Sequence, residues 1–286
     1  MGAFVVIILI IVVVFVVKGI SKRNKEKASE YYRSAAEHER NGNFDQAIND
    51  YNQAIQTESD PNYRRYKERG DLYRKIGNYD QAIADYNQAL SSIENYMEKY
   101  NKIWYEGKEA AIRQGKLGQE GWEYDNPPDF YTEKRNITEY KRNIAESLSL
   151  RGEMYDKKGD KKQAMVDYDE AIKFYNNSGT EDDLISCADV YIKKGNKEQA
   201  IEIYKKFVWE YNKAFKKDPK NFFKLYSLCQ MCVKAGDYDQ AIANFETLLQ
   251  FNQDNVKNYD DVKVLKETQA KAREELDAIK KIVASK

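Results

Sequence analysis

The sequence predicts an all-α protein built as a solenoid of paired helices, and three observations support this fold class. The 286 residues include only 4 Pro and 14 Gly, and no stretch alternates apolar and polar residues for long, which argues against strands. A tetrapeptide of the form DQAI, KQAM or EQAI occurs five times, at intervals of 35, 82, 36 and 41 residues. Repetition near 35 residues is typical of an array of helix pairs.

The chain begins with an uninterrupted apolar run from Gly2 to Val17. Extended to Ile20, this run spans about 28 Å as a helix, against a hydrocarbon core of about 30 Å. Five of the six charged residues between positions 18 and 27 are basic. The positive-inside rule therefore predicts a transmembrane anchor at 2–20 and a basic juxtamembrane linker at 21–27. The N-terminus would lie outside, and everything from Ser21 on would be cytoplasmic.

A cleaved signal peptide is the alternative for this segment. The run lacks a basic n-region, and no A-x-A site follows it. An anchor is therefore favoured, but whether residues 1–20 are retained or removed stays open. Beyond residue 20 the chain is strongly polar, and a mean hydropathy of −0.84 excludes a multi-span membrane protein.

Each tetrapeptide belongs to a longer pattern that indicates where one helix ends and the next begins. A glycine lies five residues before the alanine of the tetrapeptide and predicts a left-handed helix end. The next residue is Asn or Asp, a good N-cap, and a glutamine three residues later completes a capping box. An aromatic residue follows the alanine by four positions, on the same helix face. The five glycines are Gly42, Gly77, Gly159, Gly195 and Gly236.

A second helical pattern precedes each glycine, as in YKERGDLYRKIG at 66–77 and LSLRGEMYDKKG at 148–159. A helix–turn–helix of about 34 residues with these landmarks resembles the tetratricopeptide repeat (TPR) family. The resemblance covers residues 28–60, 63–92, 145–178, 181–210 and 222–252. It implies a TPR-type α-solenoid with repeats 1–2 in residues 28–92 and repeats 3–5 in residues 145–252.

Two insertions and a terminal segment remain. The helical period continues through 91–115 and resumes from Tyr131, with Pro127 and Pro128 in the loop between. Residues 93–144 are therefore predicted to form a projecting helical hairpin, tipped by Trp122, Tyr124 and Phe130. A smaller insertion lengthens the helix around Trp209. Residues 259–284 are predicted to form a capping helix that covers the last open face, as solenoids require.

Little in the sequence supports catalysis or cofactor binding. The only histidine, His38, occupies a position that is tyrosine in three other repeats and Cys232 in the fifth, which indicates a packing residue. Cys229 and Cys232 have no second pair for zinc, and small packing positions explain them better. Balanced charge, with 47 basic and 47 acidic residues, gives no overall attraction for nucleic acid. We therefore expect no enzyme activity, metal, cofactor, small-molecule substrate or nucleic acid. An enzyme with its site in 91–145 is the alternative, but that insertion lacks a catalytic constellation.

The resemblance also implies where partners bind, because TPR solenoids hold peptides or helices on the concave surface lined by their first helices. Mapped onto this chain, the groove is expected to pass from basic through acidic to apolar; random surface charge is the alternative. A clamp for chaperone tails is not matched, since Asp71 stands where an asparagine is needed. The expected groove residues are Arg64, Lys67, Asp71, Arg74, Lys75, Glu146, Glu153, Asp156, Asp182, Asp189, Phe223 and Tyr226.

These observations predict a membrane-anchored, non-enzymatic TPR scaffold or adaptor that gathers protein or peptide partners. The alternative is an exported TPR protein of the bacterial envelope that assists secretion or envelope assembly. Protease accessibility of intact cells distinguishes the two, since cytoplasmic repeats are protected.

Overall fold

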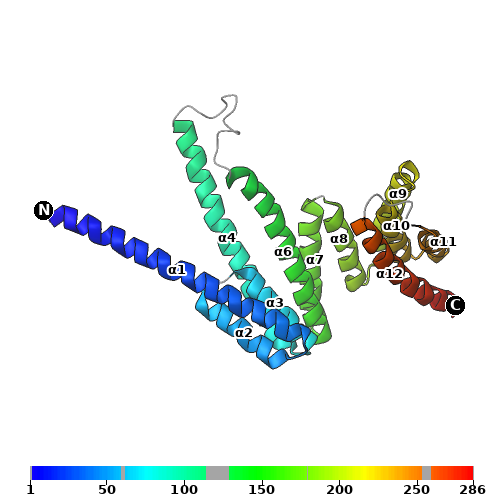
Figure 1. Ribbon diagram of the computed structural model, residues 1–286, viewed down its shortest axis with the longest axis horizontal. Helices are drawn as coiled ribbons and strands as arrows, with labels where there is room; N and C mark the ends of the chain where they lie inside the picture. Colours follow the sequence, from blue (N-terminus) through cyan, green and yellow to red (C-terminus); the bar gives the residue numbers. More distant parts are fainter. Residues whose placement is uncertain (1, 59–61, 114–128, 179, 253–258, 286) are drawn as a thin grey trace. The chain divides into compact units, whose positions relative to one another are not determined.

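The computed structural model describes residues 2–58, 62–113, 129–178, 180–252 and 259–285. Within these ranges the side chains of 2–14, 100–101, 103–137, 178 and 259–261 are not described. The described residues form eleven helices and no strand (Figure 1). The all-α prediction is therefore confirmed for this part of the chain, and the arrangement is a TPR-like helical solenoid.

The chain divides into two compact bodies between residues 178 and 179. The N-terminal body contains α1 (Gly2–Arg40), α2 (Phe44–Thr57), α3 (Tyr63–Lys75), α4 (Tyr79–Arg113), α6 (Asp129–Lys157) and α7 (Lys161–Ser178). The C-terminal body contains α8 (Glu181–Lys194), α9 (Lys197–Lys217), α10 (Phe222–Ala235), α11 (Tyr238–Leu249) and α12 (Tyr259–Ala284). Repeats 1 to 5 correspond to the pairs α1–α2, α3–α4, α6–α7, α8–α9 and α10–α11.

The turn within each repeat has the local chemistry that the sequence predicts. All five landmark glycines have a positive φ, between 76° and 89°, a left-handed conformation that disfavours a Cβ atom. Four of the five N-cap residues accept a hydrogen bond from the backbone N–H of the glutamine three positions later: Asn78, Asp160, Asn196 and Asp237. Asn43 is the exception, because its side chain makes no capping bond.

The core of each repeat includes the predicted alanine and the aromatic residue four positions later. In every repeat these two residues are at most 2% exposed. In repeat 3 the aromatic ring of Tyr168 lies over Gly152, where an added Cβ would stand 2.9 Å from Tyr168 Cε1. In repeat 2 a Cβ at Gly70 would stand 3.1 Å from Tyr86 Cε1. These two glycines let the first helix approach the ring of the second.

A partly buried arginine connects three helices in each of repeats 2 and 3. Arg69 of α3 donates to both carboxylate oxygens of Asp85 on α4, at 2.8 and 2.6 Å, and to Asn52 on α2 of the preceding repeat. Arg151 makes the same contacts with Asp167 and Asn87 one repeat later. Asp85 and Asp167 are 3% and 1% exposed. Bidentate pairing satisfies these carboxylates inside the core.

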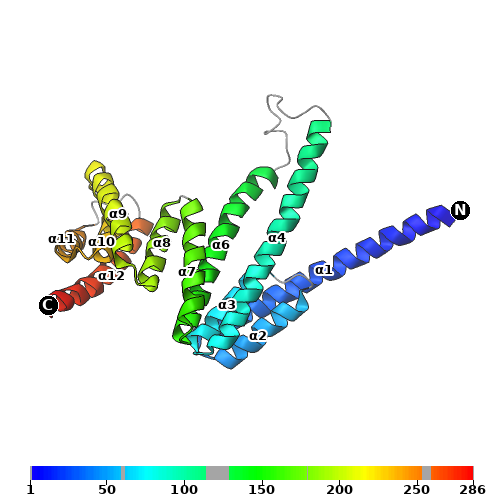
Figure 2. The ribbon, with the colours of Figure 1, turned by 180° about the vertical axis from the view of Figure 1, so that it is seen from behind.

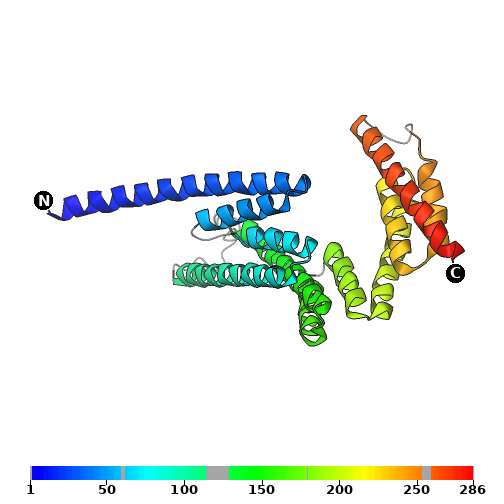
Figure 3. The same ribbon diagram turned by 90° about the horizontal axis from the view of Figure 1, so that it is seen from below.

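Helix α1 continues without interruption through the stretch predicted as a linker, because residues 20–40 contain neither Pro nor Gly. Among the residues whose side chains are described, no helix is both long and apolar enough to cross a membrane. The structure therefore gives the predicted anchor at 2–20 no support, and the side chains of 2–14 lie outside the described residues. Near its C-terminal end α1 packs along α2 (Figure 3).

The second helix of repeat 2, α4, is 35 residues long, and α6 has 29 residues. The two helices lie side by side in both views (Figures 1 and 2). Tyr96 and Tyr140 pack between them, with ring centroids 4.4 Å apart. Of the predicted hairpin tip, Trp122 and Tyr124 lie outside the described residues, and so does the side chain of Phe130.

In the C-terminal body, α12 packs on α11 and α10 (Figure 3). Its buried residues Leu265, Ala272, Leu276 and Ile279 share one helix face and join a core that includes Leu228 and Phe245. The side-chain amide of Gln269 donates to the backbone oxygens of Leu248, Leu249 and Phe251. These bonds satisfy carbonyls at the end of α11.

Candidate functional site

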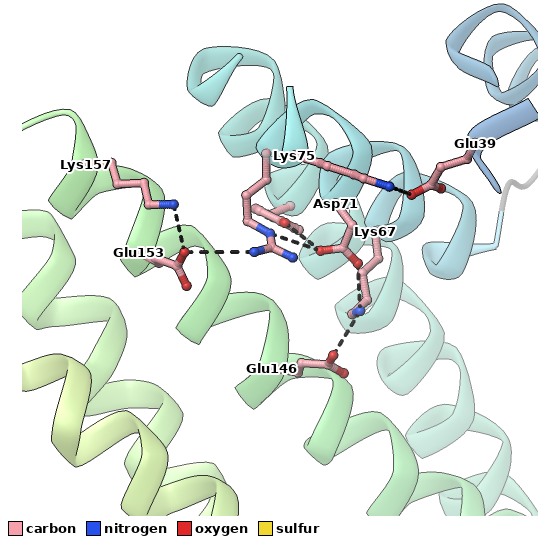
Figure 4. A network of polar contacts seen from close by, with 9 residues as sticks. Glu39, Lys67, Asp71, Lys75, Glu146, Glu153 and Lys157 are labelled. Carbon is pink, nitrogen blue, oxygen red and sulfur yellow. Dashed lines mark hydrogen bonds and ion pairs between the residues drawn. The ribbon is translucent and has the colours of Figure 1, made fainter. Parts of the chain in front are cut away.

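Ion pairs between α3 and α6 dominate the face lined by the first helices of the N-terminal body (Figure 4). Arg64 pairs with Glu139, Lys67 Nζ lies 2.9 Å from Glu146 Oε1, and Arg74 Nη1 lies 3.9 Å from Glu153 Oε1. The three glutamates are spaced seven residues apart and therefore follow one face of α6. We call this set the charge ladder. It joins the predicted basic cluster of repeat 2 to the acidic residues of repeat 3.

Asp71 lies at the centre of the ladder. Its carboxylate is 3.1 Å from Lys67 Nζ and 3.7 Å from Arg74 Nε, and it accepts a hydrogen bond of 2.8 Å from the buried Tyr86 hydroxyl. Burial alone would lower the pKa of Lys67, but Asp71 and Glu146 outweigh burial and raise this pKa. Burial and Asp71 raise the pKa of Tyr86. Both groups therefore keep their protons at neutral pH and hold Asp71 in place.

A pocket of about 450 Å³ opens beside the ladder, between α1, α2 and α3. Glu39 and Lys75 pair across its edge at 3.4 Å. Inside, Glu68 accepts hydrogen bonds from the hydroxyls of Tyr51 and Tyr32. Burial and Glu68 raise the pKa of both tyrosines, so they stay neutral donors. The pocket is thus lined by the carboxylates of Glu39, Glu68 and Asp71 and by the cations of Arg40 and Lys75, with Tyr51 beneath them.

The remaining predicted residues of repeat 3 pair locally on the same body. Glu153, besides contacting Arg74, lies 3.1 Å from Lys157 Nζ. Asp156 lies 2.5 Å from Lys161 Nζ, at the start of α7. The predicted passage from a basic to an acidic zone is therefore, in the structure, a set of ion pairs in which each charge has an opposite neighbour. Long side chains from adjacent repeats reach one another here, which a repeat-by-repeat reading of charge does not show.

In the C-terminal body, Asp189 of α8 accepts hydrogen bonds from Lys234 of α10, at 2.7 Å, and from Tyr204. Tyr226 donates to Glu275 of α12 at 3.0 Å, so α12 covers part of the predicted apolar zone. Phe223 remains 50% exposed and stacks on Phe222. Asp182, in the first turn of α8, is exposed.

Sequence reasoning named Lys75 as a groove residue but missed that a cation recurs at its position in every repeat. The position two residues before each landmark glycine is basic in all five repeats: Arg40, Lys75, Lys157, Lys193 and Lys234. A cation is favourable in the last turn of a helix. In repeats 2 and 3 it also lies over an aromatic ring at the start of the preceding second helix, Lys75 over Phe44 and Lys157 over Tyr79. Alignment of the five copies on their glycines would have revealed it.

The three cysteines are packed inside the repeats, whereas the His38 side chain is 33% exposed. Cys187, Cys229 and Cys232 are fully buried, and His38 Nε2 lies 3.8 Å from Asp50 Oδ2. Among the described residues no group of His, Cys, Asp and Glu could hold a metal ion. Burial raises the pKa of both Cys187 and Cys232 to about 11, and that of Cys229 also rises.

We expect all three thiols of the native chain to resist alkylation at pH 8, because the reactive thiolate is scarce and the sulfur is enclosed. Counting modified cysteines by mass spectrometry, before and after denaturation in urea, checks this prediction. Fast modification of the native chain at any of the three would contradict the packing described here.

Comparisons with known proteins agree with the repeat assignment. Two tetratricopeptide repeat models match the chain, one at residues 23–97 and the other at 145–178 and 187–208. TPR repeats are therefore supported in these segments. No curated protein matches the sequence significantly.

Solved structures with a similar fold are of low identity. One is described as the assembly chaperone of RpL4, Acl4, with 16% identity, a TM-score of 0.45, and coverage of 92% of this chain and 87% of that one. The pilF protein of Pseudomonas aeruginosa has 12% identity, a TM-score of 0.41 and coverages of 92% and 99%. YrrB, described as a TPR protein with an unusual peptide-binding site, has 14% identity, a TM-score of 0.35 and coverages of 81% and 89%.

Proposed function

We propose that the chain is a non-enzymatic scaffold that binds protein or peptide partners on the face lined by its first helices, at the charge ladder and the adjacent pocket. The observation that carries this proposal is the Glu39–Lys75 pair at the pocket edge. This pair presents a positive and a negative charge to a partner. Lys75 has 52% of its side chain exposed, and Arg64 of the ladder 59%. Exposed ion pairs contribute about 0–1 kcal/mol each, so a partner's charged groups replace them at little cost.

The specificity of such a face comes from the pattern of its charges. The partly buried pairs of Lys67 with Asp71 and Glu146 connect α3 to α6. The exposed groups at the pocket edge are free to exchange partners. A peptide that carries both an acidic and a basic residue matches this edge. The paired arrangement disfavours ligands of one sign only.

A charge exchange tests this proposal without removing the ion pair. The variant Glu39→Lys/Lys75→Glu keeps an opposite pair at the pocket edge but inverts the charges a partner meets. We expect it to lose at least one protein that the unmodified full chain captures by affinity purification. The matched control is Glu246→Lys/Lys280→Glu, which exchanges a pair joined at 2.8 Å between α11 and α12. Identical captured sets for all three forms would refute the proposal.

We further propose, from the sequence alone, that residues 2–20 attach the scaffold to a membrane with the repeats on the cytoplasmic side. The apolar run followed by basic residues supports this part of the proposal. We expect the full chain to remain in the membrane fraction after alkaline carbonate extraction, and a chain beginning at residue 24 to be released. Complete release of the full chain would refute the anchor and leave the binding face untouched.

A further inference from the structure

A second groove of about 620 Å³ lies between α4, α6 and α7. Its floor is apolar and comes from all three helices: Leu90 and Met97 of α4, Ile144 and Leu148 of α6, and Phe174 of α7. Met97 and Phe174 are half-buried, whereas the other three residues are at most 7% exposed. The groove exists because α4 continues past the length of a normal repeat helix and forms a wall beside α6.

This groove and the charge ladder use opposite sides of α6. Ile144 and Glu146 are two residues apart, as are Arg151 and Glu153, and two residues correspond to about 200° of rotation around a helix. The ladder therefore faces the first helices, while the groove faces the second helices α4 and α7. A partner in the groove touches none of the residues assigned to the proposed binding face, and the two proposals stand independently.

The groove has an acidic rim. Glu94 and Glu98 of α4 and Glu170 of α7 line it and are exposed. The one guanidinium in the lining, Arg151, is engaged by both oxygens of Asp167, so its charge is already balanced. Glu94 and Glu98 stand four residues apart on one helix face, where like charges repel. This repulsion is unfavourable in the free protein, and a bound cation relieves it.

We propose that this groove binds a basic amphipathic segment of a partner protein. Apolar side chains of the segment enter between Met97 and Phe174, and lysine or arginine side chains pair with Glu94, Glu98 and Glu170. Charge complementarity selects this occupant, because the carboxylates repel nucleic-acid phosphates and anionic lipid surfaces. Helix-in-groove binding of this kind requires apolar residues at spacings of three and four, with cations beside them.

The test uses the full chain and a labelled helical peptide of about 14 residues, built from leucine and lysine in an amphipathic pattern. A peptide with glutamate in place of lysine is the control of opposite charge. The rim variant is Glu94→Gln/Glu98→Gln/Glu170→Gln. Its matched control, Glu26→Gln/Glu30→Gln/Glu37→Gln, removes three exposed carboxylates from α1 and changes the net charge equally. Binding is followed by fluorescence anisotropy at physiological salt, and folding of each variant by circular dichroism.

We expect the lysine peptide to bind the unmodified chain and the control with the same Kd, and the rim variant about tenfold more weakly. The glutamate peptide should not bind. Equal weakening in the rim and control variants would show attraction by overall charge and overturn the proposal. Absence of lysine-peptide binding would overturn it as well. So would self-association of the unmodified chain that the peptide disperses, because the occupant would then be the basic α1 of a second copy.

Discussion

Replacing Arg69 by leucine should lower the free energy of unfolding by about 3 kcal/mol at pH 7, because it leaves the Asp85 carboxylate buried without its partner. Asp85 is 3% exposed, and Arg69 supplies both of the hydrogen bonds that hold it, at 2.8 and 2.6 Å. Urea unfolding of the full chain, followed by circular dichroism, measures the effect. A loss below about 1 kcal/mol would mean that water or another group satisfies the carboxylate.

The same variant should respond to pH in a defined direction. Burial raises the pKa of Asp85, and Arg69 opposes this rise. A carboxyl whose pKa is raised on folding binds its proton more tightly in the folded state, so this contribution favours folding as pH falls and is lost as pH rises. Without Arg69 the pKa rises further. The difference in unfolding free energy between variant and unmodified chain should therefore shrink from pH 7 to about pH 5.

The chain itself supplies the control for this substitution. Repeat 4 carries Cys187 and Ile203 at the positions of Arg69 and Asp85, and both are accommodated without an ion pair. The double variant Arg69→Leu/Asp85→Ile should therefore recover most of the stability that the single variant loses, since apolar pairs of similar volume can replace buried ion pairs. A double variant as unstable as the single one would show that the loss comes from packing.

Replacing Gly152 by valine should also lower the free energy of unfolding by about 3 kcal/mol. A Cβ at this position stands 2.9 and 3.0 Å from two ring carbons of Tyr168 and 3.2 Å from the backbone oxygen of Ala164. Tyr168 is 1% exposed, so its ring has little room to move. The two helices of repeat 3 must separate, or the ring must leave the core. Urea unfolding measures the change.

Two further substitutions separate the effect of the close contact between position 152 and the Tyr168 ring from the general cost of valine in a helix. Ala84→Val places the same β-branched residue at an exposed site on α4 and should cost only its helix propensity, about 0.5 kcal/mol. Gly152→Ala should cost much less than valine, because the better helix propensity of alanine offsets part of the clash and repeat 4 carries Ala188 at this position. If Gly152→Val and Ala84→Val prove equally stable, the ring does not restrict this position.

The sequence was sufficient for the features that repeat locally. A glycine, an N-cap, an alanine and an aromatic residue each act within one or two helical turns, and their spacing carries the prediction. Asn43 makes no capping bond although its backbone, with φ −84° and ψ 65°, is close to that of Asp237, with φ −85° and ψ 74°, which does make one. The pattern of residue types therefore identifies which side chain can cap, and neither the pattern nor these backbone angles distinguishes Asn43 from the caps that form.

The site was harder to predict because its geometry depends on helix spacing. Lys67 and Glu146 are 79 positions apart and meet only because α3 and α6 line the same face. Their charges were therefore interpreted as separate zones rather than as one paired set. Tyr226 was expected on an open surface, and Glu275 of α12 contacts it there. The groove with the acidic rim was also missed, because three helices from two repeats build it.

Helix α12 affects how another helix pair can pack onto the end of the C-terminal body. It rests on α11 where the first helix of another repeat would rest, and it buries a single stripe that ends at Ile279. Its exposed side includes the charged residues Lys266, Glu267 and Lys271, beside the partly exposed Val264. A further helix pair packed directly on this part of α12 would have to bury those three charged side chains, so they disfavour extension of the apolar core across them.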